Sequence, residues 1–249
     1  MIGRILGALA LALLLGACST RSISNSGYQA DSGYGSSNPF YQGEIDSLDL
    51  FVPTSAGKID QAQIDAALAQ REPVSALLGQ PLLVIQSGAL VPDQPMMAAL
   101  GGHFDVVPFS GIPARDYGNT PSTSPSATFG DRLRLAAAKG GFHRIFVYWG
   151  MLEAARSSGP TKVISWVPII GAVIPDESQH MRIVLNAAII DVATGRWTEL
   201  TPEPVGDDAI SASINRESSD QEQVEKLKEA GYAKLAALVI ERAKALNTP

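Results

Sequence analysis

Cysteine and histidine are scarce in this chain, and each shortage removes a class of chemistry. The 249 residues contain one cysteine, Cys18, so the chain can form neither an internal disulfide nor a multi-cysteine metal site. The three histidines, His103, His143 and His180, lie far apart in the sequence, and none belongs to a metal-binding spacing such as His-x-x-x-His. We therefore predict no bound metal and no other cofactor.

Basic residues are also few, because 19 Lys and Arg stand against 25 Asp and Glu, a net charge of −6. Proteins that bind nucleic acid need clustered basic side chains to neutralise phosphates, and an acidic surface opposes this. Catalytic motifs are missing as well, since there is no Gly-x-Ser-x-Gly elbow and no glycine-rich phosphate loop. We predict no nucleic-acid partner and can assign no catalytic residue.

The first eighteen residues have the layout of an export signal. Arg4 precedes an apolar run from Ile5 to Leu15, and small residues then lead to Cys18, as in a secretory signal peptide. The ending Leu15-Gly16-Ala17-Cys18 resembles the lipobox of bacterial lipoproteins. This resemblance implies that residues 1–17 are removed and that Cys18 is acylated, with chains such as palmitate, to anchor the protein in a membrane. Because Ser19 is not aspartate, the resemblance further implies export to the outer membrane.

Residues 18–45 follow this signal and are rich in Ser, Gly, Asn and Tyr. A segment with so few aliphatic residues does not bury enough apolar surface to offset the entropy of ordering. We expect a flexible tether whose ends lie about 28 Å apart on average and at most about 85 Å apart. Such a tether would present a folded domain at a distance from the membrane anchor.

Residues 46–249 are predicted to form a single periplasmic domain of the α/β class, a mixed-sheet α/β sandwich. Thr128 and Asp131 indicate a helix start, and the apolar runs on both faces of two later segments are typical of central strands. The predicted strands are Leu48–Pro53, Pro81–Ser87, Phe104–Phe109, Phe142–Leu152, Met181–Val192 and Arg196–Leu200. The predicted helices are Ile59–Gln70, Pro92–Leu100, Arg132–Lys139 and Glu217–Leu246.

The octapeptide Ala-Ile-Ile-Asp-Val-Ala-Thr-Gly, which ends at Gly195, predicts a hairpin turn. Asp191 can bond its own backbone, and Gly195 accepts a positive φ. Together with the stretch from Thr128 to Leu200 and the final helix, it resembles envelope lipoproteins related to the curli secretion lipoprotein. Penicillin-binding-protein activator lipoproteins and the N-terminal domain of TolB are similar in architecture. The resemblance implies a non-catalytic module that binds other envelope proteins or assembles with its own copies.

An apolar, hairpin-like insertion at residues 157–180 separates the two central strands. Its core, Lys162–Pro175, is too short and too rich in proline for a membrane-spanning helix, so we predict a β-hairpin with Pro168 and Gly171 near its tip. The insertion either folds back to close the core or leaves an apolar surface for a partner or a membrane. The candidate contact residues of that surface are Trp166, Ile169 and Ile170.

These observations lead to one expected function and two alternatives. We expect an outer-membrane lipoprotein, anchored through Cys18 and facing the periplasm, that acts as a non-catalytic protein-binding or assembly module. Its partner would be an envelope protein or a second copy of the chain. The first alternative is a lipid-anchored, peptidase-like hydrolase whose site is built from dispersed loops. The second is a small-ligand carrier, which would require a closed apolar pocket.

Overall fold

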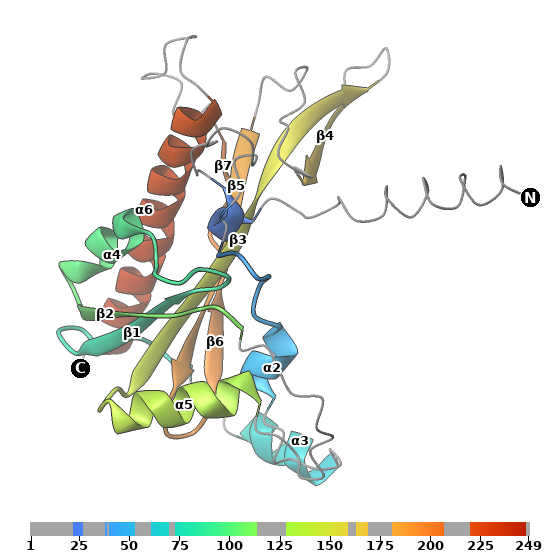
Figure 1. Ribbon diagram of the computed structural model, residues 1–249. Helices are drawn as coiled ribbons and strands as arrows, with labels where there is room; N and C mark the ends of the chain where they lie inside the picture. The colour runs from blue at the N-terminus through green and yellow to red at the C-terminus, as the bar shows by residue number, and fades with distance from the viewer. Residues whose placement is uncertain are drawn as a thin grey trace, which may run out of the picture.

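The computed structural model describes residues 22–26, 38, 40–52, 61–69, 73–113, 128–158, 163–168, 181–206 and 220–247 (Figure 1). The predicted signal peptide, the predicted lipidation residue Cys18 and the candidate contact residues Ile169 and Ile170 lie outside these ranges.

The described strands form one mixed sheet. Its main path runs β2-β1-β3-β5-β6, with β4 paired to β3 and β7 paired to β5. β1 is parallel to both β2 and β3, and the remaining pairs are antiparallel. The mixed sheet confirms the predicted fold class. The strand bounds are Pro81–Gln86 (β1), Asp105–Phe109 (β2), Arg144–Ser158 (β3), Val163–Pro168 (β4), Met181–Asp191 (β5), Trp197–Leu200 (β6) and Val205–Gly206 (β7).

Helices cover both faces of this sheet (Figure 1). Alternate residues of β3 serve the two cores, because Phe146 and Tyr148 pack with α4 and α6 while Ile145 and Val147 pack with α2 and α5. β3 is therefore the central strand predicted from its two apolar faces. The helix bounds are Ser47–Phe51 (α2), Gln61–Ala69 (α3), Gln94–Gly101 (α4), Phe129–Lys139 (α5) and Asp220–Asn247 (α6), with a 3₁₀ turn, η1, at Ile23–Asn25.

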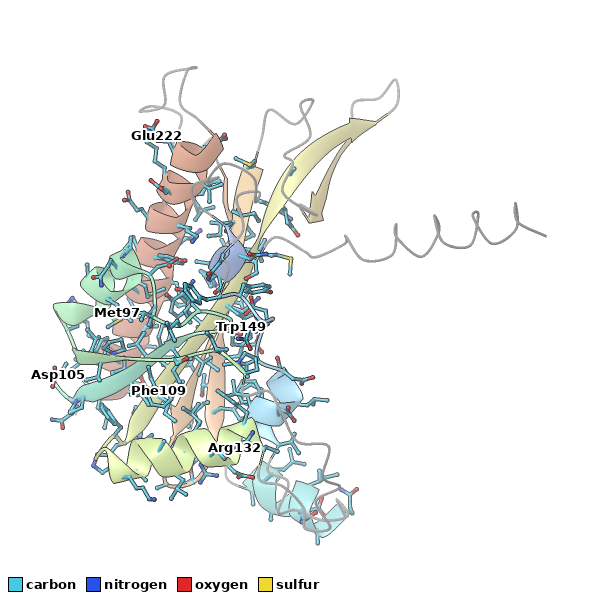
Figure 2. The ribbon with its side chains drawn as sticks, viewed as in Figure 1. Met97, Asp105, Phe109, Arg132, Trp149 and Glu222 are labelled. Atoms are coloured by element: carbon cyan, nitrogen blue, oxygen red, sulfur yellow. The ribbon has the colours of Figure 1, made fainter. Side chains whose placement is uncertain are left out.

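Local sequence signals explain where α5 begins and how α6 packs. The hydroxyl of Thr128 accepts a hydrogen bond from the Asp131 N–H at 3.1 Å, which caps α5 as predicted. On α6, Gly231 lets the helix approach β5, since a Cβ at this position would lie 2.9 Å from a methyl of Ile183. No helix in the described residues is long and apolar enough to cross a membrane. Figure 2 shows Glu222 at the start of α6 and Arg132 on α5, at opposite ends of the molecule.

Two local predictions are wrong. Leu48–Pro53 was expected to be a strand, but Ser47–Phe51 forms helix α2, because the Asp46 carboxylate caps it by accepting from the Leu48 N–H at 2.7 Å. The hairpin at the insertion exists, but its tip lies elsewhere: β4 pairs with β3 so that Ser158 faces Val163 and Pro168 faces Glu153. Gly159-Pro160 is a stronger turn signal than Pro168, which a strand end tolerates.

Ser22–Ser26 packs into the fold, which corrects the expectation of a flexible tether over residues 18–45. Ser22 forms an antiparallel bridge with Met151 of β3. The side chain of Ile23 is fully buried in the core that β3 shares with α4 and α6. Ile23 lies beside Gly150, where an added Cβ would be in ordinary van der Waals contact with a methyl of Ile23, at 3.4 Å. Only residues 19–21 separate Cys18 from this docked segment.

The docked segment makes a prediction for stability. Replacing Ile23 with alanine removes a fully buried side chain and should lower the free energy of unfolding by about 2–5 kcal/mol, the usual range for such a cavity. Urea denaturation of the detergent-solubilised chain measures the change. Ile64→Ala is the matched control, because Ile64 on α3 is 43% exposed and should change stability by no more than about 0.5 kcal/mol. Equal effects of the two substitutions would contradict the docking.

Candidate functional site

A buried amide side chain connects three parts of the chain at the carboxyl end of β1. The Oε1 atom of Gln86 accepts from the Tyr148 hydroxyl at 2.6 Å and from the Asp93 N–H at 2.7 Å. Its Nε2 atom donates to the Ser24 hydroxyl oxygen at 3.0 Å. Gln86 is fully buried, so these bonds replace the water that an amide otherwise requires. The network joins β3, the start of α4 and the N-terminal segment.

Further polar contacts fasten the N-terminal segment to the loop after β1. The Ser24 hydroxyl donates to the Ser87 carbonyl, and the Ser87 hydroxyl accepts from the Ile45 N–H at 2.8 Å. The side-chain amide of Asn38 donates to the Ser24 carbonyl at 3.1 Å. Ser24, Ser87 and Asn38 are all buried. A segment that is poor in apolar residues is thus ordered by hydrogen bonds to distant parts of the fold.

The carboxyl end of β1 is a topological switch point. From β1 the chain passes through α4 to β2 on one side, whereas β3 pairs with β1 on the other side. α4 and α5 cover opposite faces of the sheet. In open α/β sheets, ligands bind at such points, beyond the carboxyl ends of parallel strands. The position alone therefore indicates where a binding site belongs in this fold.

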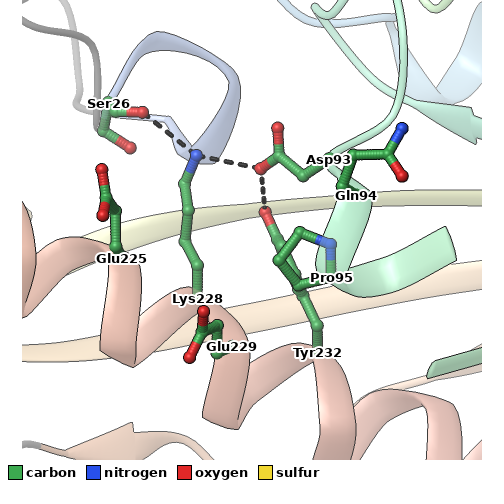
Figure 3. Close-up of a pocket in the computed structure, with 8 residues that line it drawn as sticks. All are labelled: Ser26, Asp93, Gln94, Pro95, Glu225, Lys228, Glu229 and Tyr232. Carbon is green, nitrogen blue, oxygen red and sulfur yellow. Dashed lines mark hydrogen bonds and ion pairs between the residues drawn. The ribbon is translucent and has the colours of Figure 1, made fainter. Parts of the chain in front are cut away.

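A pocket of about 330 Å³ opens near this point, between α4 and α6 (Figure 3). The Asp93 Oδ2 atom accepts from the Tyr232 hydroxyl at 2.6 Å and from the Lys228 Nζ atom at 2.9 Å. Lys228 also donates to the Ser26 carbonyl at 3.0 Å, so this ion pair reaches back to the docked segment. The full lining consists of Ser26, Asp93, Gln94, Pro95, Glu225, Lys228, Glu229 and Tyr232.

The pocket presents negative charge. Lys228 is 8% exposed, and its charge is compensated by Asp93 and the Ser26 carbonyl. Glu225 and Glu229, one helical turn apart on α6, are both exposed at the rim. The lining residues include neither histidine nor cysteine, and the Ser26 hydroxyl donates to the Ile23 carbonyl. With three acidic side chains and one basic one, the described lining carries a net charge of −2, which attracts a cationic group.

A second acidic group lies beside the docked segment. Burial raises the pKa of Glu44 above its ordinary value, and hydrogen bonds from the hydroxyls of Ser22, Ser87 and Tyr41 only partly oppose this rise. Burial, reinforced by the nearby Glu44 carboxylate, raises the pKa of Tyr41 to about 12. The carboxyl of Glu44 thus carries a burial cost whenever it is ionised.

The residues singled out from the sequence lie away from this pocket. Asp191 and Gly195 form the turn between β5 and β6, where Asp191 accepts from the N–H and hydroxyl of Thr194, both at 2.8 Å, and Gly195 has φ +73°. Arg144 forms an ion pair with Asp191. Trp166 lies in β4, opposite Ala155 near the other end of the sheet. The structure therefore does not bring the predicted turn residues and the predicted contact residue together.

Sequence reasoning missed the pocket residues, although one signal was present. Lys228 lies among the apolar positions of α6, next to the fully buried Leu227 and one turn before the fully buried Tyr232. A lysine within a buried helical stripe needs a partner. That partner, Asp93, is 135 residues away, and no sequence pattern connects the two.

The chain is a bacterial lipoprotein, a class of protein anchored in a membrane of the cell envelope. The profile of the YafT bacterial lipoprotein family matches residues 46–242, more than half of the chain, so the protein belongs to this family. None of the curated proteins compared with the chain matches it. Among the described residues, no group of three or more His, Cys, Asp or Glu side chains could hold a metal ion.

The buried ion pair at the pocket is open to a direct test. Lys228→Met leaves the Asp93 carboxylate without its buried cation and should lower the free energy of unfolding by about 3–5 kcal/mol. Lys226→Met is the matched control on the same helix, because Lys226 pairs with Glu222 at the surface and such pairs contribute about 0.5 kcal/mol. Chemical denaturation measures both. Similar losses for the two variants would show that Lys228 does not depend on a buried partner.

Glu44 predicts a pH dependence whose sign follows from its raised pKa. A carboxyl whose pKa is higher in the folded state stabilises the fold below its unfolded pKa, and this stability is lost as pH rises through the folded pKa. Glu44→Gln keeps the shape without the charge. The variant should therefore be more stable than the parent at pH 7, and this advantage should disappear at pH 4. Thermal unfolding across that range checks the trend, which a constant difference would contradict.

Proposed function

We propose that this lipoprotein is anchored in the outer membrane through Cys18, faces the periplasm, and acts as a non-catalytic binding module for an envelope protein. The pocket between α4 and α6 is its binding site, and it takes a basic side chain of the partner, lysine or arginine. Removal of residues 1–17 and acylation of Cys18 belong to the same proposal. The residue after the cysteine, Ser19, supports the outer membrane over the inner one.

The observation that carries this proposal is the distribution of charge in the pocket. Among the described residues that line it, the three acidic side chains of Asp93, Glu225 and Glu229 stand against the one basic side chain of Lys228, which leaves a net charge of −2. An anionic ligand would meet two like charges, and a cationic group would meet two opposite charges. The volume of about 330 Å³ is at the lower end of the range for ligand pockets, which suits a single side chain better than a large metabolite.

The resemblance of the β5–β6 hairpin to the curli-secretion and penicillin-binding-protein-activator lipoproteins supports the same choice. The resemblance to those lipoproteins implies that this domain binds or assembles with other proteins and does not catalyse a reaction. A second copy of this chain is one partner consistent with the proposal, because the chain itself carries exposed basic side chains such as Lys234. A second copy and another envelope protein would both place a basic side chain in the pocket, so one experiment tests both partners.

Crosslinking in cells tests the pocket. A photocrosslinking residue placed at the exposed rim position Gln94 should form adducts with a polypeptide. Glu225→Lys combined with Glu229→Lys should reduce the yield at least tenfold, as about 1.4 kcal/mol of lost binding energy would. The size of the adduct then distinguishes a second copy from another envelope protein.

The matched control makes the same kind of charge reversal at a single position elsewhere on the same helix. Glu241→Lys lies twelve residues from Glu229, about 18 Å along α6, and should leave the adducts unchanged. Adducts that survive the double reversal, or that disappear equally with Glu241→Lys, would show that the pocket is not the binding site.

A further inference from the structure

We propose that the hairpin of β3 and β4 lies against an anionic phospholipid surface, beside the lipid anchor. This inference rests on the proposed acylation of Cys18. The β3–β4 arm is defined as residues 155–158 of β3 together with β4, the part of the hairpin that pairs with no other strand of the described sheet. Three features of the chain support this: the length of the anchor, the position of Ser22 on β3, and the sequence of the arm.

The anchor is short. Ser22 is fixed in the fold by its bridge to Met151 and by its hydroxyl, which donates to Glu44. Four residue steps separate Cys18 from Ser22, and a fully extended chain covers at most about 3.6 Å per step, or about 14 Å in all. An acylated Cys18 at the membrane surface therefore keeps this edge of β3 within about 14 Å of the lipid. The domain is held at the membrane rather than presented at a distance from it.

Ser22 and the arm lie on the same edge of β3. This edge pairs in turn with β1 at residues 144–148, with Ser22 at Met151, and with β4 at residues 153–158. Ser22 is therefore only two residue positions along β3 from the first residue that pairs with β4, Glu153. Trp166 pairs with Ala155, four residues beyond Met151, or about 14 Å at about 3.4 Å per residue. The distance along β3 from Ser22 to the level of Trp166 is therefore about equal to the greatest distance that the anchor can span from Ser22 to Cys18.

The arm extends past the body of the sheet. β5 pairs with β3 only as far as Ala154, while β4 follows β3 to Ser158, about 14 Å further. A two-stranded hairpin by itself is marginally stable in water. A surface that covers such an arm therefore stabilises it. Figure 1 shows the arm projecting from the end of the molecule where α6 begins.

The sequence of the arm suits contact with lipid better than contact with the basic protein partner that is proposed for the pocket. β4 contains Ile164 and Trp166, and tryptophan favours the boundary between hydrocarbon and headgroups. Residues 154–168 include Arg156 and Lys162 and no acidic residue, although the whole chain carries a net charge of −6. Local basic residues in an acidic protein match the negative potential of anionic lipids.

Fluorescence quenching tests the inference on the acylated protein. The protein is reconstituted into vesicles of phosphatidylethanolamine and phosphatidylglycerol that carry brominated acyl chains near the headgroup. Bromine quenches tryptophan fluorescence at short range. The emission should therefore fall by the share that one of the three tryptophans contributes. Trp166→Phe should abolish the bromine-dependent loss. Trp197→Phe is the matched control, because β6 pairs with β5 near Ile190, toward the opposite end of the sheet, and the loss should persist.

Flotation of the same vesicles separates this inference from the proposed function. If the protein floats with the vesicles and Cys18→Ala does not, but Trp166→Phe leaves the quenching unchanged, the arm does not touch lipid and only this inference is overturned. If Cys18→Ala floats as well as the parent, the anchor proposal fails, and the inference that rests on it fails too. A photocrosslinker in place of Trp166 that captures another polypeptide in cells instead of lipid would also overturn it.

Discussion

The docking of Ser22–Ser26 onto the carboxyl end of β1 is the contact on which the rest of the structure depends. The Gln86 amide joins this segment to β3 and to the start of α4, and the Lys228 ammonium group joins it to α6. A buried polar group left without its partner costs about 1–3 kcal/mol, and several such groups here are completed by the segment. The domain is therefore complete only with Ser22–Ser26, which begin four residue positions after Cys18.

The elements that the sequence predicts well are those specified by neighbouring residues. Thr128 caps α5, and β3 is apolar on both faces because both are buried. Where a local pattern was ambiguous, a single polar group decided the outcome, as Asp46 did for α2. The docked segment could not be found in this way. Its composition indicates little apolar burial, whereas its order comes from hydrogen bonds to residues such as Gln86, 62 positions away from Ser24.

The candidate site shows the same limit more strongly. A lysine inside the buried stripe of α6 was visible as a residue in need of a partner, but the partner is chosen by topology. The chain turns at the carboxyl end of β1, and this brings Asp93, at the start of α4, against Lys228 and Tyr232. Periodicity within one helix carries no information about the helix packed beside it, so the pocket follows from the sheet order and not from any motif.

The proposed binding site and the hydrogen-bonded β5–β6 turn lie toward different ends of the sheet. The turn of Asp191 and Gly195, held by Arg144, lies at one end, while the docked segment and the β3–β4 arm lie toward the other. The proposed anchor on Cys18 is short enough to confine the domain to a layer next to the membrane, where a partner in the same layer meets it at a high effective concentration. A pocket that takes a single basic side chain, as proposed, is too small to bind tightly by itself. In this proposal, confinement at the membrane makes such a weak site sufficient.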